Sequence, residues 1–79
     1  MRLDKYLKVS RIIKRRTVAN EACDAGRVMV NGKVARASYD VKVNDIIEIS
    51  FGTRDFKAQV TSVAETVKKE DAVNMYTVI

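Results

Sequence analysis

The sequence predicts an α+β fold in which two helices come first and a small, mainly antiparallel β-sheet follows. Apolar residues recur with a helical period over residues 3–10 and again over residues 19–23, and the period changes to two after Gly26. An Asn31-Gly32 pair between two short apolar runs then predicts a tight hairpin. The chain has 79 residues, and we expect it to form a single domain over residues 1–79.

The first helix is predicted from about residue 3 to about residue 9, and an extension to residue 13 is left open. Asp4 in its first turn suits the positive end of the helix dipole. The basic run Lys14-Arg15-Arg16 follows, and we expect it to cover the turn between the two helices. The buried stripe has the spacing i, i+3, i+4, i+7 and consists of Leu3, Tyr6, Leu7 and Ser10.

A second helix is predicted to follow Thr17 as its N-cap, with Asn20 in the place of a capping-box Glu. Gly26 is expected to end this helix, because a left-handed backbone suits glycine. The small size of the buried stripe predicts close packing against the first helix. That stripe consists of Ala19, Ala22 and Cys23, and the cysteine is interpreted as a buried apolar residue.

The sheet is predicted to begin with a hairpin, since both central residues of a type I′ turn at Asn31-Gly32 need positive φ. Its strands are predicted over residues 28–30, 33–35, 46–51, 56–63 and 76–79, with turns at 41–45 and 52–55. Residues 68–71, Lys-Lys-Glu-Asp, are interpreted as a solvated loop. Among the aromatic residues, Tyr6, Phe51 and Phe56 are expected in the core, and Tyr39 is expected to anchor a loop rather than stack on a base.

Charge is distributed unevenly along the chain. Residues 1–36 hold ten Lys or Arg and three Asp or Glu, a net charge of +7, whereas residues 37–79 hold five and seven, a net charge of −2. Six of the basic residues lie within twelve consecutive positions, 5–16. A directed positive field attracts polyanions, and the planar fork of arginine suits phosphate oxygens. The first half is therefore interpreted as an RNA-binding surface.

Composition argues against an enzyme. The chain has no His, so neither a Ser-His nor a Cys-His arrangement can form, and its glycines build no phosphate-cradling loop. One cysteine cannot make an internal disulfide, and no His is present to complete a zinc site. No apolar run approaches membrane-spanning length. We expect a cytoplasmic, monomeric binding protein with no catalytic residues, no metal, no cofactor and no membrane contact.

The segments RLDKYL, RRTVA and AGRVMVNG, at this spacing, resemble the S-four RNA-binding domain family, named after the fourth small-subunit ribosomal protein. The resemblance covers about residues 2–48, and the strands within about 46–79 are additional to it. Arg16 fills the basic position that precedes a small residue in the signature of the family. The resemblance implies an αα-hairpin followed by a small sheet, and RNA as the ligand.

The short length is similar to that of stand-alone bacterial members that act in ribosome-associated quality control. That resemblance implies binding to obstructed large ribosomal subunits through large-subunit rRNA and peptidyl-tRNA. It also implies support of C-terminal alanine tailing by an RqcH-like tailing factor on the same subunit. Heat-shock ribosome recycling and a basic protein–protein adaptor remain open as alternatives. A DNA-binding helix-turn-helix is disfavoured, because the basic run lies in the interhelical turn.

Roles can be assigned to single residues, and for Arg2 and Arg16 the resemblance implies them. Arg2 and Arg16 match its basic positions and are the first expected RNA contacts. Asp4 is expected to orient a neighbouring arginine, since a carboxylate facing phosphate would be repelled. The remaining expected RNA-binding residues are Arg11 and Arg15 as secondary contacts, Lys5, Lys8 and Lys14 as general phosphate attraction, and Arg27 as an extension of the surface.

Overall fold

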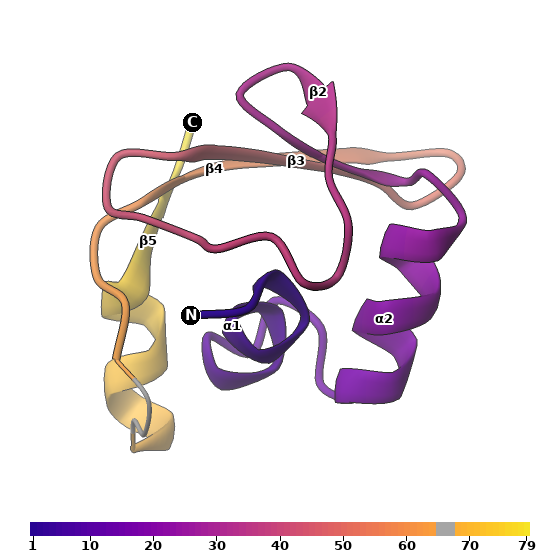
Figure 1. Cartoon of the computed structure of the whole chain (residues 1–79). Coiled ribbons are helices and arrows are strands. Elements are labelled where there is room, and N and C mark those ends of the chain that lie inside the picture. Colours follow the sequence, from indigo (N-terminus) through magenta and orange to yellow (C-terminus); the bar gives the residue numbers. More distant parts are fainter. Residues whose placement is uncertain (65–67) are drawn as a thin grey trace.

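The computed structural model describes residues 1–64 and 68–79, and its elements follow the predicted order (Figure 1). The helices are α1 (Leu3–Val9), α2 (Arg16–Asp24) and the 3-10 helix η1 (Lys69–Met75). The strands are β1 (Val28–Val30), β2 (Lys33–Val34), β3 (Ile46–Ser50), β4 (Asp55–Val60) and β5 (Tyr76–Val78). They pair antiparallel in the order β2-β1-β3-β4-β5. The predicted α+β class is confirmed.

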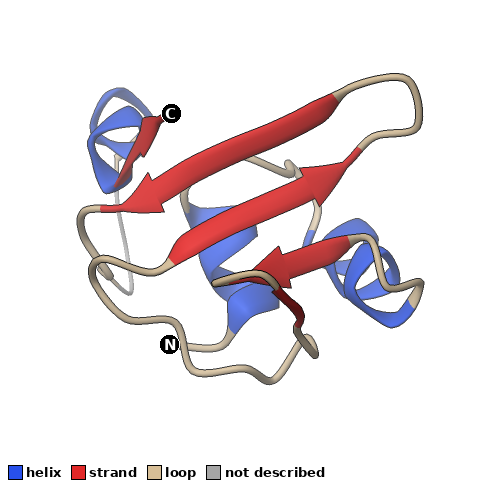
Figure 2. Ribbon diagram, turned by 90° about the horizontal axis from the view of Figure 1, so that it is seen from above, coloured by secondary structure: helices blue, strands red, loops and turns tan. Residues whose placement is uncertain are grey.

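The helices cover one face of the sheet and leave the other face open (Figures 1 and 2). Alternate strand residues point toward the helices and are buried, as the two-residue period predicts. The open face carries the intervening positions, among them the paired Glu48 and Lys57. The buried centre of the core contains Leu3, Tyr6, Leu7, Val28, Ile47, Ile49 and Val60. No helix in the described ranges is long and apolar enough to cross a membrane.

The first helix ends at Val9, as predicted, and does not continue to Ile13. Ser10 is its C-cap, and the next residue, Arg11, has a left-handed backbone with φ of 62°. A left-handed residue stops the helix, and the side chain of Ser10 turns inward to donate to the carbonyl of Leu7 at 3.3 Å. The connection to α2 therefore carries the exposed basic side chains that the sequence places there.

The prediction of Thr17 as the N-cap of the second helix is wrong. Helix α2 begins at Arg16, its N-cap is Arg15, and no side chain caps it. Asn20 does not act in a capping box, because its side chain bonds to Asp4 of α1 instead. The N-terminal half of α2 is thus held by a contact between helices rather than by a local cap.

The predicted glycine end of α2 is confirmed. Gly26 has φ of +73°, which a left-handed helix end requires. The N–H of Gly26 donates to the carbonyl of Cys23 at 3.0 Å, and that of Arg27 donates to Ala22 at 3.0 Å. This pair of bonds is a Schellman motif. The Asn31-Gly32 hairpin is confirmed as well, with φ of 54° and 84° and the pair Val30–Lys33 flanking the turn.

Three predictions for the second half are wrong. The strand predicted over 56–63 spans residues 55–60, because the N–H of Thr61 turns to the carbonyl of Met75. Phe51 lies beyond the end of β3 and is 46% exposed, whereas Phe56 packs edge-on against Tyr76 with centroids 5.9 Å apart. The predicted loop at 68–71 enters η1 at residue 69, since burial of Ala72 and Met75 supports a helical turn.

Candidate nucleic-acid interface

A buried carboxylate joins the two helices. The side chain of Asp4 is only 3% exposed, and its carboxylate accepts hydrogen bonds from Nε of Arg2 at 3.2 Å and from Nη2 of Arg2 at 3.3 Å. Nε of Arg16 lies 3.4 Å from the second oxygen. Nδ2 of Asn20 at 3.3 Å and the backbone N–H of Lys5 at 2.8 Å complete the donors. We call Arg2, Asp4, Arg16 and Asn20 the Asp4 cluster.

Hydrogen bonds within the Asp4 cluster offset the free-energy cost of burying the charged carboxylate of Asp4. Burial alone raises the pKa of the Asp4 carboxyl. Hydrogen bonds from Arg2, Asn20, the Lys5 N–H and Arg16 together outweigh burial, so the pKa lies below its usual range. The side chains of Arg2 and Arg16 remain 52% and 48% exposed. About half of each arginine side chain is thus accessible beside the carboxylate that holds it, and a guanidinium has further N–H donors that can bind an anion.

The start of α1 is held by a loop from the sheet half. Arg2 forms an isolated antiparallel bridge with Asp40. The first two N–H groups of α1 donate to the carbonyls of Tyr39 at 2.8 Å and Ala37 at 3.1 Å, which satisfies donors that a helix start leaves unpaired. The N-terminal ammonium of Met1 donates to Asp40 at 2.6 Å. The backbone of Arg2 is therefore fixed on both sides.

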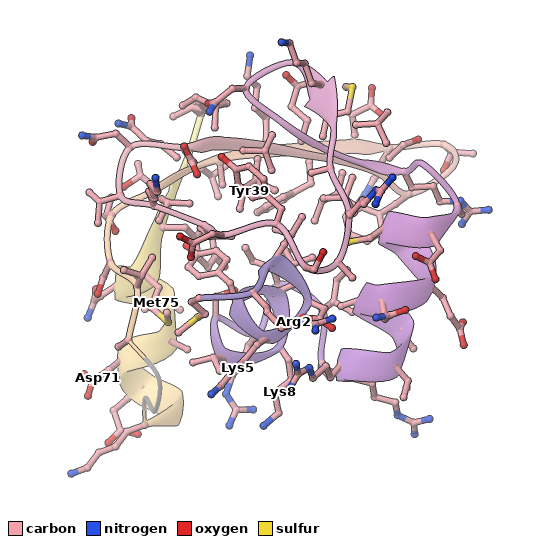
Figure 3. The ribbon with its side chains drawn as sticks, viewed as in Figure 1. Arg2, Lys5, Lys8, Tyr39, Asp71 and Met75 are labelled. Carbon is pink, nitrogen blue, oxygen red and sulfur yellow. The ribbon has the colours of Figure 1, made fainter. Side chains whose placement is uncertain are left out.

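The other predicted RNA-binding residues lie on α1 and on the connection that follows it. Lys5 and Lys8 point from α1 away from the sheet (Figure 3). Arg11, Lys14 and Arg15 are exposed between the helices. These five therefore extend a basic surface from the start of α2 along α1.

Arg27 lies at a distance from the other predicted RNA-binding residues. It follows α2, at the end of the helix opposite to Arg16, and a nine-residue helix is about 13 Å long. It lines a separate hollow of about 260 Å³ together with Val18 and Glu21. The structure thus brings Arg2 and Arg16 to one carboxylate and leaves Arg27 apart.

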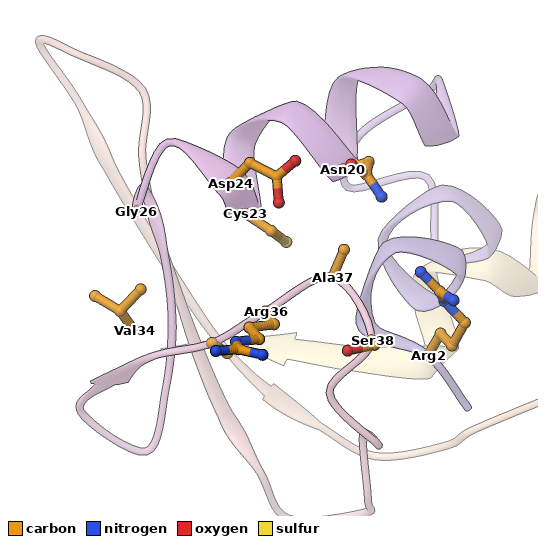
Figure 4. A pocket seen from close by; sticks show the side chains of 10 residues that line it. Arg2, Asn20, Cys23, Asp24, Gly26, Val34, Arg36, Ala37 and Ser38 are labelled. Atoms are coloured by element: carbon orange, nitrogen blue, oxygen red, sulfur yellow. The ribbon is translucent and has the colours of Figure 1, made fainter.

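Two residues of this region, one inside the Asp4 cluster and one beside it, are not predicted as functional from the sequence. Asn20 was assigned a capping role, and no local pattern signals a bond to a residue 16 positions earlier. Arg36 lies in the segment between β2 and β3, which carries no motif. It lines a groove of about 560 Å³ between α2 and residues 34–38, with Arg2 and Asn20 also on its wall (Figure 4).

The tyrosines and the cysteine are structural. Tyr6 is fully buried, and its hydroxyl donates to the carbonyl of Met75 at 2.7 Å. Tyr39 donates to the carboxylate of Asp45 at 3.0 Å, and burial together with this bond raises the pKa of its hydroxyl. Burial, with the nearby acids, raises the pKa of the Cys23 thiol to about 11. Within residues 1–64 and 68–79, no group of three or more acidic or cysteine side chains could hold a metal ion.

Comparison with known proteins agrees with this architecture. The family model described as S4 domain matches residues 1–47. The trimeric structure of Vibrio cholerae heat shock protein 15 superposes with a TM-score of 0.92 at 25% identity, covering 100% of this chain and 81% of that chain. The solution structure of the hypothetical protein HP1423 gives a TM-score of 0.84 at 28% identity, with coverage of 100% and 96%. The chain belongs to the S4 domain family, the S-four family that its motifs resemble.

Relatives that match this chain over its full length indicate a particular group within the S4 domain family. A protein of Streptococcus pneumoniae (strain ATCC BAA-255 / R6) is 58% identical over 79 residues, which cover 100% of this chain and 90% of the relative. A protein of Bacillus subtilis (strain 168) is 53% identical over 79 residues, with coverage of 100% and 92%. Both are named RQC P-site tRNA stabilizing factor. Within the S4 domain family, this chain belongs with these factors, the RqcP proteins.

Proposed function

We propose that this protein is an RNA-binding factor of ribosome-associated quality control. It binds obstructed large ribosomal subunits that carry peptidyl-tRNA, stabilises the tRNA and supports C-terminal alanine tailing of the stalled chain. The observation that carries the proposal is the Asp4 cluster, in which one buried carboxylate holds two half-exposed arginines at 3.2 and 3.4 Å. Relatives with the names given above supply the biological setting.

The geometry supports different roles for the two arginines of the Asp4 cluster and for the surrounding cations. Arg2 and Arg16 make directed contacts with phosphate oxygens, because Asp4, which also accepts a hydrogen bond from Asn20, fixes them before RNA arrives. The surrounding cations attract the backbone without a fixed geometry. If about five phosphates are neutralised, log K should fall against log salt with a slope of roughly −3.5 to −4.5. Structured RNA is read by shape, phosphates and 2′-hydroxyls, so the ligand is a folded rRNA–tRNA junction rather than a base sequence.

The proposed partners are large-subunit rRNA, peptidyl-tRNA and an RqcH-like tailing factor on the same subunit. The protein acts in the cytoplasm as a monomer and as one domain over residues 1–79. Its part is to hold RNA in place, which requires binding and no catalytic group. The tailing factor performs the elongation.

Sedimentation of bacterial lysate tests the proposal. Tagged wild-type protein should sediment with large subunits, and peptidyl-tRNA should be enriched in the same fractions. Arg16→Glu should abolish this association, because it places a repulsive charge where phosphate binds. Lys57→Glu makes the same charge change on the open face and should retain binding. Wild-type protein at the top of the gradient at low salt, or retention of Arg16→Glu on subunits, would overturn the proposal.

Heat-shock ribosome recycling is a second candidate, favoured by the superposition on heat shock protein 15 over the whole chain. An alanine-tail assay separates the two roles. Cells that lack this protein should lose alanine tails, and wild-type protein but not Arg16→Glu should restore them. Unchanged tails would favour recycling, whereas an association that survives RNase would favour a protein–protein adaptor.

A further inference from the structure

The groove beside Arg2 has two walls of different character. Asn20 and Asp24 stand on the α2 side, and Arg36 and Ser38 stand on the side of residues 34–38 (Figure 4). Its volume of about 560 Å³ lies within the range of about 300–1,000 Å³ that is typical of ligand pockets. Because Arg2 and Asn20 belong both to this groove and to the Asp4 cluster, the groove opens directly onto the proposed RNA contact.

The wall that carries Arg36 is fixed to α1. The carbonyl of Ala37 accepts the N–H of Asp4 at 3.1 Å, and the carbonyl of Arg36 itself accepts the N–H of Tyr39 at 3.0 Å. The neighbours of Arg36, Ala35 and Ala37, are both buried in the core. The backbone of Arg36 thus has a set position relative to the Asp4 cluster, while its side chain is exposed.

The charge along this wall continues beyond the groove. Arg36 also lines a neighbouring hollow of about 590 Å³, on whose wall Lys33 lies. Arg36 therefore stands between two recesses, with Arg2 on one side and Lys33 on the other. A row of cations of this kind follows a phosphate backbone, which carries one negative charge per nucleotide.

We propose that the RNA held by Arg2 and Arg16 continues through the groove between α2 and residues 34–38, where Arg36 contacts a further phosphate. This inference rests on the proposed function and adds a second recognition element to the same surface. Asp24 carries a carboxylate on the opposite wall of the groove from Arg36 (Figure 4). It repels phosphate, so the strand runs along the Arg36 wall.

Substitutions on the two walls of the groove should change RNA affinity in opposite directions. Arg36→Gln removes one phosphate contact, and it should weaken binding about 4- to 6-fold at 0.15 M salt and reduce the salt slope by about 0.7–0.9. Asp24→Asn removes the repulsion and should strengthen binding by roughly 2- to 5-fold, the range of an exposed charge pair. Loss of folding cannot produce the second effect.

The test uses purified large ribosomal subunits that carry peptidyl-tRNA, titrated with fluorescently labelled full chain at several salt concentrations. Lys57→Gln and Glu48→Gln change charge by the same amounts on the open face and should shift affinity less than twofold. Arg36→Lys keeps the charge and should recover most of the salt slope. Thermal unfolding of each variant shows that it is folded.

The outcomes separate this inference from the proposed function. If Arg16→Gln loses binding while Arg36→Gln and Asp24→Asn match the open-face controls, the groove carries no RNA and the proposed function stands. If wild-type protein fails to bind these subunits, the proposed function itself is wrong. A weakening by Arg36→Gln together with a strengthening by Asp24→Asn supports the path through the groove.

Discussion

The helical half and the sheet half each contain ion pairs between acidic and basic side chains, and these ion pairs differ in how deeply they are buried. The side chain of Asp4 is 3% exposed and receives donors from both helices, whereas that of Glu48 is 35% exposed and lies 3.8 Å from Lys57 on the open face of the sheet. Exposed pairs contribute little to stability, because solvent screens them and both side chains lose freedom. The buried acid fixes the position of two arginines, and the exposed pair fixes nothing.

The largest expected effect comes from removing the buried charge. Asp4→Asn should lower the free energy of unfolding by about 1–3 kcal/mol, because the half-exposed arginines lose the buried charge to which they are bonded. It should also weaken binding to large subunits at least roughly tenfold, since both arginines lose their common anchor. Urea unfolding and subunit titration measure the two effects. Glu48→Gln is the matched control, and an equal loss in both variants would contradict the comparison.

Lowering the pH should also reveal how much the charge of Asp4 contributes to stability. The folded pKa of Asp4 lies below its ordinary value of 3.8, so its contribution to stability is complete above about pH 4. It is lost as the pH falls further, through the folded pKa. The gap in unfolding free energy between wild type and Asp4→Asn should therefore narrow below about pH 4 in urea titrations. A gap that stays constant down to about pH 2 would show that the charge is not the cause.

A smaller effect is expected where α1 contacts the C-terminal segment. Tyr6→Phe removes the buried bond from the tyrosine hydroxyl to the carbonyl of Met75 at 2.7 Å. That carbonyl also accepts the N–H groups of Thr61 and Ser62, so the loss should be about 1 kcal/mol. Affinity for large subunits should not change, because Tyr6 lies in the core. A weaker association in folded Tyr6→Phe would contradict the separation of core from RNA surface.

The smallest predicted change is a gain in stability. Arg11 has φ of 62°, a conformation that costs residues other than glycine about 1 kcal/mol. Arg11→Gly should therefore raise the free energy of unfolding by about 0.5–1 kcal/mol. If Arg11 neutralises a phosphate, the same variant should reduce the salt slope of binding by about 0.7–0.9. Thermal unfolding and salt titration of one protein check both; lower stability would show that Arg11 is not strained.

The sequence predicts the elements well, because local chemistry determines them. The left-handed ends at Gly26 and Asn31-Gly32 are properties of single residues and were confirmed. Phe51 was misplaced because the alternating pattern continues one residue past the last pair of the ladder, Ser50–Asp55. The sequence predicts a loop at residues 68–71 because these residues are charged. The helical signal lies further along, in Ala72 and Met75, which are buried and three residues apart.

The site was harder to predict, because it depends on contacts between distant residues. The motif places Arg2 and Arg16 among the basic residues, but only the fold shows that Asp4 reaches both. Asn20 looked like a local cap, and the bond to Asp4 that replaces this role spans two helices. Arg36 gave no signal, since it lies in an irregular segment whose place beside α2 is set by backbone bonds to α1.

The bond between Tyr6 and Met75 has a consequence for the order of folding. The two residues are 69 positions apart, so this contact closes nearly the longest loop that the chain allows. Such a loop costs entropy before any contact repays it. We expect α1 and α2 to associate early. The contact between α1 and η1 should then form only after the transition state. Stopped-flow kinetics of Tyr6→Phe should then show faster unfolding and unchanged refolding. Slower refolding would show that the contact between Tyr6 and Met75 is already formed in the folding nucleus.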